Sequence, residues 1–254
     1  MKALDQIYFT KKNKMEQKKV VLAYSGGLDT SYCLKKLSQE NHEVHAVCIN
    51  TGGFSDNDIK SMEKRAYEIG AYRYKNVDGL ETFYNKIVKY LIFGNVLKNN
   101  TYPLSVSAER IIQAVEIVSY AKSINAKYIA HGSTGAGNDQ VRFDMIFQIL
   151  APEIEIISLI RDQNLSRESE IKYLNSHGIN ISWEKAKYSI NTGLWGISIC
   201  VLIAEAKGHT VVSVSDICNI DSGDVSFIPI FPSDVMRSLS FDDAVPLVLK
   251  TMKL

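Results

Sequence analysis

The chain has 254 residues, 46% hydrophobic and 22% charged, and a formal net charge of +1. This composition is typical of a globular protein with one or two domains, and the charge gives no reason to expect nucleic acid or an acidic surface as a partner. Four cysteines without a C-x-x-C or Cys/His pattern, and the lack of a membrane-length apolar run, argue against a metal site or a membrane span and favour a reducing cytoplasm.

The first nineteen residues form a separate compositional segment. They contain six lysines and show little hydrophobic periodicity, so we expect a solvated basic arm over residues 1–19. Met15 is a plausible alternative start. From Val20 onward, segments typical of strands and of helices alternate.

The sequence AYSGGLDTSYC contains the first motif. The apolar run 20–23 predicts a buried strand, and Cys33, Leu34 and Leu37 have the spacing of a helix face. A glycine turn at a helix N-terminus exposes backbone N–H groups and favours a bound anion, here a phosphate. Ser-Gly-Gly alone fits an ordinary connection equally well, and neither a Walker A loop nor a G-x-G-x-x-G motif occurs. The possible cap residues of this helix are Asp29, Thr30 and Ser31.

The alternation continues along the chain and predicts an α/β fold with a doubly wound, mostly parallel sheet. Strands are expected over 43–50, 72–78, 126–132 and 154–160, and a polar loop over 99–110. Helices are expected over 56–71, with Ile59, Met62, Ala66 and Ile69 on one side, over 81–97, with Phe83, Ile87 and Leu91 in the core, and through Ile111, Ala114, Val115, Val118 and Ala121.

A second glycine-rich motif, YIAHGSTGAGNDQVRFD, follows a predicted strand at residues 128–144. A helix is expected after it, with Val141, Met145, Phe147 and Leu150 as its apolar positions. Three glycines (Gly132, Gly135 and Gly137) alternate with polar groups (Thr134, Asn138, Asp139 and Arg142), which indicates close approach to a ligand, although the Asp/Arg pair alone could be a surface ion pair.

Together with YSINTGLWGIS at residues 188–198, these motifs give the chain a resemblance to the argininosuccinate synthase family. The resemblance covers about residues 20–198 and implies an adenine nucleotide alpha hydrolase-like fold. It also implies a reaction in which citrulline attacks Mg-ATP to give citrullyl-AMP and pyrophosphate, and aspartate then displaces AMP. The implied cofactor is Mg²⁺ with the nucleotide, and the implied substrates are ATP, citrulline and aspartate.

The resemblance also implies roles for individual residues, none of them a covalent nucleophile. ATP would be bound by Ala23, Tyr24, Ser25, Gly26, Gly27, Leu28, Asp29, Thr30, Ser31, Ile49 and Gly132. Aspartate would be bound by Thr134, Asn138 and Asp139, and citrulline by Tyr102, Ser107, Asn138, Arg142, Ser189 and Ser198.

The chain departs from the family pattern in two places. Many members carry a lysine where Ala136 stands, and residues 199–254 match neither the family's second domain nor its tetramer-forming C-terminal helix. We therefore expect a nucleotide-binding domain over 20–198 and a divergent, irregular tail over 199–254. An impaired ATP-binding remnant is the alternative function. A tRNA thiolase or an amidotransferase synthetase is disfavoured, because the chain lacks paired catalytic cysteines, a basic RNA-binding segment and a glutaminase motif.

Overall fold

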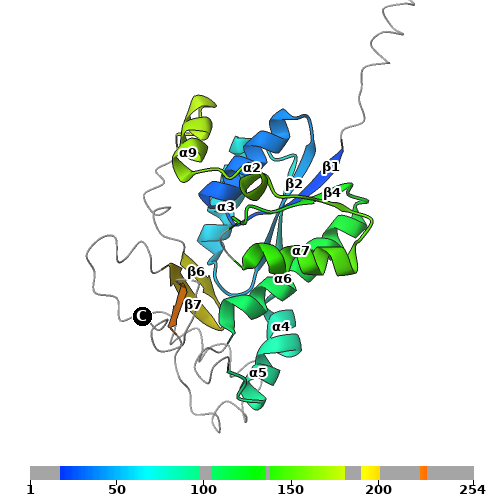
Figure 1. The fold of residues 1–254 in the computed structure, drawn as a ribbon, viewed down its shortest axis with the longest axis vertical. Helices are drawn as coiled ribbons and strands as arrows, with labels where there is room; N and C mark the ends of the chain where they lie inside the picture. Colours follow the sequence, from blue (N-terminus) through cyan, green and yellow to red (C-terminus); the bar gives the residue numbers. More distant parts are fainter. Residues whose placement is uncertain (1–17, 98–103, 136–137, 181–189, 201–223, 228–254) are drawn as a thin grey trace, which may run out of the picture.

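A computed structural model describes residues 18–97, 104–135, 138–180, 190–200 and 224–227. Its centre is a five-stranded, all-parallel sheet in the order β3-β2-β1-β4-β5, which confirms the predicted α/β class (Figure 1). Because all five strands run the same way, their carboxyl ends share one edge of the sheet. The strands are β1 (Lys19–Ala23), β2 (Glu43–Asn50), β3 (Arg73–Asp78), β4 (Tyr128–Ala130) and β5 (Glu155–Ile157).

Helices cover both faces of the sheet, and the strand residues alternate between two apolar clusters. Val20 and Leu22 pack in one cluster, whereas Val21 between them packs in the other. The first cluster is covered by α2 (Leu28–Gln39), α3 (Asp56–Ile69), α8 (Leu159–Asp162) and α9 (Arg167–Ser176), and the second by α6 (Ser105–Ser123) and α7 (Asp139–Leu150) (Figure 1). The expected face of α3 is confirmed, since Met62, Ala66 and Ile69 are buried.

The helix expected over 81–97 is wrong in register and length. It is made of α4 (Leu80–Phe83), a π-helical turn η1 (Tyr84–Val88) and α5 (Lys89–Phe93). The π turn inserts one extra residue, so the buried face passes from Phe83 to Val88 and Ile92. Ile87 and Leu91, expected in the core, are only partly buried.

Two further helix boundaries differ from expectation. The loop expected over 99–110 ends early, because Leu104 adopts a left-handed backbone (φ 58°) and α6 begins at Ser105. Helix α2 begins at Leu28 with Gly27 as its N-cap, and no side chain caps it. Asp29, Thr30 and Ser31 therefore lie inside the first turn, where their amides belong to the helix terminus.

A second, antiparallel sheet contains β6 (Ile190–Gly193), β7 (Gly196–Cys200) and β8 (Asp224–Phe227). Strand β8 comes from the expected irregular tail and pairs with β7. The turn between β6 and β7 is fixed to the parallel sheet, because the Leu194 N–H donates to the carbonyl of Thr51 at 2.9 Å. The side chain of Leu194 is buried in a third apolar cluster, with Phe83, Tyr84, Val88, Ile92, Ala108 and Ile112.

No helix in the described part of the chain is long and apolar enough to cross a membrane. Cys33 and Cys48 are free and buried.

The apolar face expected for α7 is wrong at three of its four positions. Phe147 is buried, but Val141, Met145 and Leu150 are exposed. Phe143 takes the second buried position, four residues before Phe147, and stacks on the imidazole of His131 with ring centroids 5.8 Å apart. The helix therefore presents its aromatic residues, rather than its aliphatic ones, to the sheet.

We predict that Phe147→Ala lowers the free energy of unfolding by about 3–5 kcal/mol, because it leaves a cavity in a fully buried site. Met145→Ala, on the same helix but 46% exposed, should change it by less than about 0.5 kcal/mol. Urea denaturation measures both values. Equal losses in the two variants would contradict the observed face of α7.

Candidate functional site

The first glycine motif forms a turn between β1 and α2 at the carboxyl edge of the sheet. Gly26 has φ +72°, and a Cβ there would lie 2.7 Å from Cγ of Met62, so this position requires glycine. Gly27 differs, because a Cβ there would meet only Ser25 Oγ at 3.5 Å. The protein itself thus leaves room beside Gly27, at the start of a helix whose first amides have no side-chain cap.

Side chains on either side of the turn fix its backbone. Arg65 of α3 donates from Nη1 to the carbonyl of Gly26 at 2.8 Å. The Thr30 hydroxyl donates to the carbonyl of Gly27 at 3.3 Å and lies 3.4 Å from Ser25 Oγ. With these carbonyls engaged, the amides of the turn and of the first turn of α2 remain as donors for an anion.

The second motif meets the first directly. A Cβ at Gly132 would lie 3.1 Å from the backbone nitrogen of Thr30 and 3.2 Å from the carbonyl carbon of Asp29. Only a glycine lets the chain leaving β4 pass this close to the first turn of α2. The structure therefore brings the two glycine motifs, about 100 residues apart, into backbone contact.

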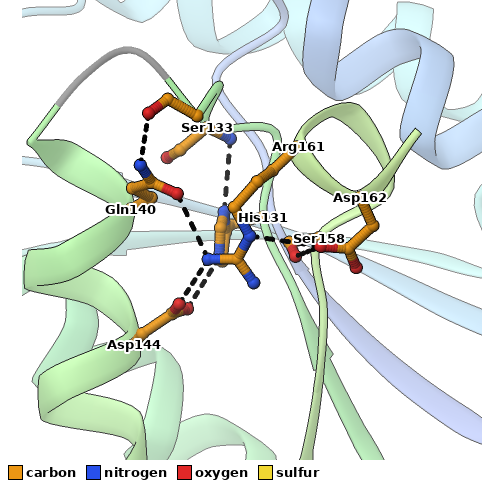
Figure 2. A network of polar contacts seen from close by, with 8 residues as sticks. His131, Ser133, Gln140, Asp144, Ser158, Arg161 and Asp162 are labelled. Atoms are coloured by element: carbon orange, nitrogen blue, oxygen red, sulfur yellow. Dashed lines mark hydrogen bonds and ion pairs between the residues drawn. The ribbon is translucent and has the colours of Figure 1, made fainter. Parts of the chain in front are cut away.

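A buried polar network holds the second glycine loop in place (Figure 2). His131 accepts at Nδ1 from the Ser133 N–H at 3.2 Å, so its proton lies on Nε2, which donates to Asp144 at 2.9 Å. Burial lowers the pKa of His131, which keeps the ring neutral at pH 7. The ring thus ties the start of the loop to helix α7.

Arg161 extends this network on the other side of the loop. Its guanidinium donates to Asp144, to Asp162 at 3.2 Å and to Gln140 at 3.3 Å. Gln140 in turn donates to the carbonyl of Gly135 at 2.7 Å. The loop is therefore fixed at both ends by hydrogen bonds to side chains, at Ser133 and at Gly135.

Asp139, at the start of α7, lies between two guanidinium groups. Arg110 of α6 donates from Nε at 2.8 Å, and Arg142 donates from Nη1 at 2.6 Å. Burial alone would raise the pKa of Asp139, but the two arginines hold the pKa of this carboxyl below its usual value. Asp139 is thus an anion at neutral pH and orients both arginines.

The polar contacts continue from Arg110 across α6 to the end of β2. Arg110 donates from Nη1 to Gln113 at 2.8 Å, and Gln113 donates to the Thr51 hydroxyl at 3.3 Å. Thr51 donates to Glu109 Oε2 at 3.3 Å. This polar chain, Asp139–Arg110–Gln113–Thr51–Glu109, runs along the carboxyl edge of the sheet beside the second glycine loop.

A second buried carboxyl group lies behind the first motif. Glu170 of α9 is 1% exposed and faces Asp29, the second residue of α2. Burial and the charge of Asp29 raise the pKa of Glu170 to about 8, and burial also raises the pKa of Asp29. The pair therefore holds a proton at neutral pH, which removes one negative charge from beneath the proposed phosphate site.

The structure brings most of the predicted site residues to this one edge. Residues 23–31, Gly132, Thr134, Asn138, Asp139 and Arg142 all lie there, with Thr134 and Asn138 exposed. Ile49 is at the end of β2, but its side chain is in the second apolar cluster, so only its backbone can face a ligand. Ser107 is in the first turn of α6, and Ser198 lies in β7, opposite Asn191. Tyr102 and Ser189 lie outside the described residues.

The sequence reasoning missed the residues that support these loops. They are Thr51, Arg65, Glu109, Arg110, Gln113, His131, Asp144, Arg161 and Glu170. His131 carried one signal, because it stands inside the quoted motif at the end of an apolar strand. Asp144 stands at the end of the same motif. Glu109 and Arg110 fall in the segment expected as a polar loop, and the others lie in helices or, for Thr51, just after β2, where a polar residue gives no sign of being turned inward.

Comparison with known proteins identifies the family. The family described as Arginosuccinate synthase N-terminal HUP domain matches residues 19–180. An argininosuccinate synthase of Sulfolobus acidocaldarius is 43% identical over 182 residues, which is 71% of this chain and 46% of that protein. That of Methanocaldococcus jannaschii is 42% identical over 180 residues, 70% of this chain and 45% of that protein. That of Lactococcus lactis subsp. lactis is 40% identical over 197 residues, 77% and 49% of the two chains.

The chain spans less than half the length of these three relatives. The matched part contains the five-stranded parallel sheet and both glycine motifs. The chain belongs to the argininosuccinate synthase family and carries its N-terminal domain.

Proposed function

We propose that this chain binds Mg-ATP at the carboxyl edge of its parallel sheet and uses it to join citrulline to aspartate, giving argininosuccinate, AMP and pyrophosphate. The observation that carries the proposal is the backbone contact between Gly132 and Thr30. It places the uncapped N-terminus of α2 beside a loop that carries Thr134, Asn138 and Asp139. An anion site and a set of polar groups thus adjoin, as an ATP-dependent ligation needs.

ATP would be held chiefly by backbone donors. The turn from Ser25 to Thr30 presents amide groups at a helix N-terminus, where the helix dipole favours phosphate. Arg65 fixes the Gly26 carbonyl, and the Thr30 hydroxyl fixes that of Gly27. Gly132 and the backbone of Ile49 would border the nucleotide.

Magnesium would enter with the nucleotide. Among the described residues no group of three or more His, Cys, Asp or Glu side chains could hold a metal ion. This fits Mg²⁺, which proteins usually bind through one or two carboxylates and the substrate phosphates. The ion would neutralise phosphate charge during transfer.

The second glycine loop and α7 would hold the amino acids. Aspartate would bind at Thr134, Asn138 and Asp139, with the anionic Asp139 facing its ammonium group. Arg142 would pair with the citrulline carboxylate, because a guanidinium can donate two parallel hydrogen bonds to a carboxylate. Its present partner Asp139 keeps it extended along α7. Tyr102, Ser107, Asn138, Ser189 and Ser198 would complete the citrulline site.

Catalysis would come from positioning and charge rather than from a covalent intermediate with the protein. The turn amides would stabilise the leaving pyrophosphate while the ureido oxygen attacks the α-phosphate. The proton shared by Glu170 and Asp29 would lower the negative charge behind the phosphates. We also propose a cytoplasmic location, in keeping with the free thiols of Cys33 and Cys48.

The departure of residues 199–254 from the family pattern supports a second candidate function. The chain spans only 45–49% of the three relatives named above. A protein that keeps the nucleotide half but lacks residues of the other half would bind ATP and ligate slowly or not at all. The second candidate is therefore an ATP-binding remnant of the synthase.

One assay separates the two candidates. Release of pyrophosphate from ATP is measured with citrulline alone and with citrulline plus aspartate. Citrulline-dependent release, followed by argininosuccinate when aspartate is added, is expected of the synthase. Tight ATP binding without either product indicates the remnant, and no ATP binding contradicts both.

We predict that Gly27→Val weakens ATP binding roughly 10-fold or more, because the new side chain would displace phosphate from charge-assisted amide donors. The fold should tolerate the change, since a Cβ at this position meets only Ser25 Oγ at 3.5 Å. Calorimetric titration measures the affinity, and an unchanged melting temperature shows that folding is intact. Wild-type ATP affinity in this variant would exclude the turn as the phosphate site.

Arg142→Ala should act on the other substrate. We expect citrulline binding to weaken about 10- to 150-fold, as for a lost hydrogen bond to a charged group, while ATP affinity stays within about twofold. Gly27→Val is the reciprocal control. Equal losses for both ligands in Arg142→Ala would mean that this arginine contacts phosphate or supports the fold.

A further inference from the structure

The tip of the β6–β7 hairpin, residues 193–195, packs against a buried carboxyl group of helix α6. Glu109 is 2% exposed, and a Cβ built at Gly193 would overlap its carboxyl carbon and both its oxygens. The carboxyl group thus lies on the α-carbon of Gly193, in the space that any other residue would need for its side chain. The adjoining backbone N–H of Trp195 donates to the same carboxyl group.

The hairpin tip is held by two further contacts to the end of β2. The Leu194 N–H donates to the Thr51 carbonyl at 2.9 Å, and a Cβ at Gly52 would lie 3.2 Å from the nitrogen and Cβ of Leu194. Gly52 itself has φ +97°. The tip therefore packs closely against the edge of the sheet, because Gly52 and Gly193 have no side chain and the carboxyl group of Glu109 lies on Gly193.

Glu109 is also the last member of the polar chain that begins at Asp139. Its Oε2 accepts from Thr51, whereas Oε1 is buried without a hydrogen-bond partner. A buried carboxylate with one oxygen unpaired is costly, so the group favours its neutral form. Thr51 thus takes part in both sets of contacts. Its hydroxyl belongs to the polar chain that begins at Asp139 of α7, and its carbonyl accepts from the hairpin tip.

We infer that Glu109 is a positioning residue, which fixes the tip of the β6–β7 hairpin against the sheet edge and thereby sets the affinity for the second substrate without contacting it. The inference rests on the proposed function, in which Ser198 of β7 and Ser189 just before β6 belong to the citrulline site. Strands β6 and β7 both contact α6, whose first turn carries Ser107, so one helix carries a citrulline residue and the carboxyl group that holds the hairpin.

The position of the hairpin depends on pH through the same group. Burial raises the pKa of Glu109 from 4.5 to about 7. The charge of Arg110 on the same helix acts to lower this pKa, and the charge of Asp139 of α7 acts to raise it. The hairpin tip itself offers only Gly193, Leu194 and Trp195, none of which titrates. Because folding raises the pKa of this carboxyl group, the group contributes its full stabilisation of the folded state below about pH 4.5. This contribution is lost as the pH rises through about 7.

Hydrogen exchange of peptides spanning residues 190–197, corrected for the intrinsic effect of pH, measures tip docking directly. In the wild type we expect protection to fall between pH 5 and pH 8, by at most roughly 300-fold, the limit that a rise of about 2.5 in the pKa allows. Glu109→Gln keeps the shape and cannot ionise, so its protection should stay the same at both pH values. In Glu109→Ala, the amides of the hairpin tip should exchange fast at both pH values.

Substrate affinity is measured on the same variants by calorimetry, with citrulline titrated in the presence of a non-hydrolysable ATP analogue. We expect Glu109→Ala to weaken citrulline roughly 10-fold or more and to leave ATP affinity unchanged, and Glu109→Gln to restore citrulline binding. Glu116→Ala is the matched control, because it removes a carboxyl group two turns further along α6. Its exchange and affinities should equal those of the wild type.

The outcomes separate the inference from the proposed function. A wild type that binds no citrulline contradicts the proposed function, while the exchange data still decide whether Glu109 fixes the hairpin. Wild-type exchange and wild-type citrulline affinity in Glu109→Ala overturn the inference. So does pH-independent exchange in the wild type. If Glu109→Ala does not fold, Glu109→Gln still decides, because a pH-dependent tip in that variant overturns the role of the carboxyl group.

Discussion

The close passage of Gly132 over the first turn of α2 is the constraint on which the rest of the site depends. Two loops about 100 residues apart in the sequence meet here, because a Cβ at Gly132 would lie 3.1 Å from both the backbone nitrogen and the side-chain methyl group of Thr30. Such contact demands that both loops be rigid, because a glycine loses more conformational entropy on ordering than any other residue. The surrounding side chains supply that rigidity: Arg65 and Thr30 for the first loop, and the network of His131 for the second.

The two loops are supported in different ways, and the difference follows from what each would bind. The first loop has its carbonyls occupied and its amides available, which suits an anion. The second loop is fixed by the neutral imidazole of His131 and the side-chain amide of Gln140, and exposes Thr134 and Asn138. A phosphate site made of backbone is insensitive to side-chain identity, whereas a site for amino acids is set by side chains.

The alternating apolar runs predicted the parallel sheet well, because a strand buried on both faces leaves a continuous hydrophobic signal, as in β1 and β2. The glycines at 26 and 132 indicated two loops that meet at the sheet edge, where a Cβ at either position would be crowded. Local sequence did not predict the π turn at Tyr84–Val88, since an inserted residue shifts the buried face without changing the composition. Nor did it predict the whole face of α7, because only Phe147 of the four expected apolar positions is buried, and the second buried position is Phe143, which stacks on His131. Glu109 was missed because it falls in the segment expected as a polar loop, and only the tertiary contact with Gly193 shows that its carboxyl group is buried.

The same geometry predicts that the proposed nucleotide binding can be separated from the proposed ligation. Every proposed ATP contact comes from β1, α2, the end of β2 and the end of β4, which share one sheet and its two apolar clusters. The proposed citrulline contacts come from three places: α6, α7 and the hairpin, which belongs to another sheet and is joined to the first through Thr51, Glu109 and the buried Leu194. A hydrogen bond to a charged group contributes about 1.5–3 kcal/mol, so losing two of them through a displaced hairpin costs roughly 10²–10⁴ in affinity. The proposed phosphate site therefore needs only the parallel sheet, whereas the proposed citrulline site also needs the hairpin to stay where it contacts the carboxyl group of Glu109.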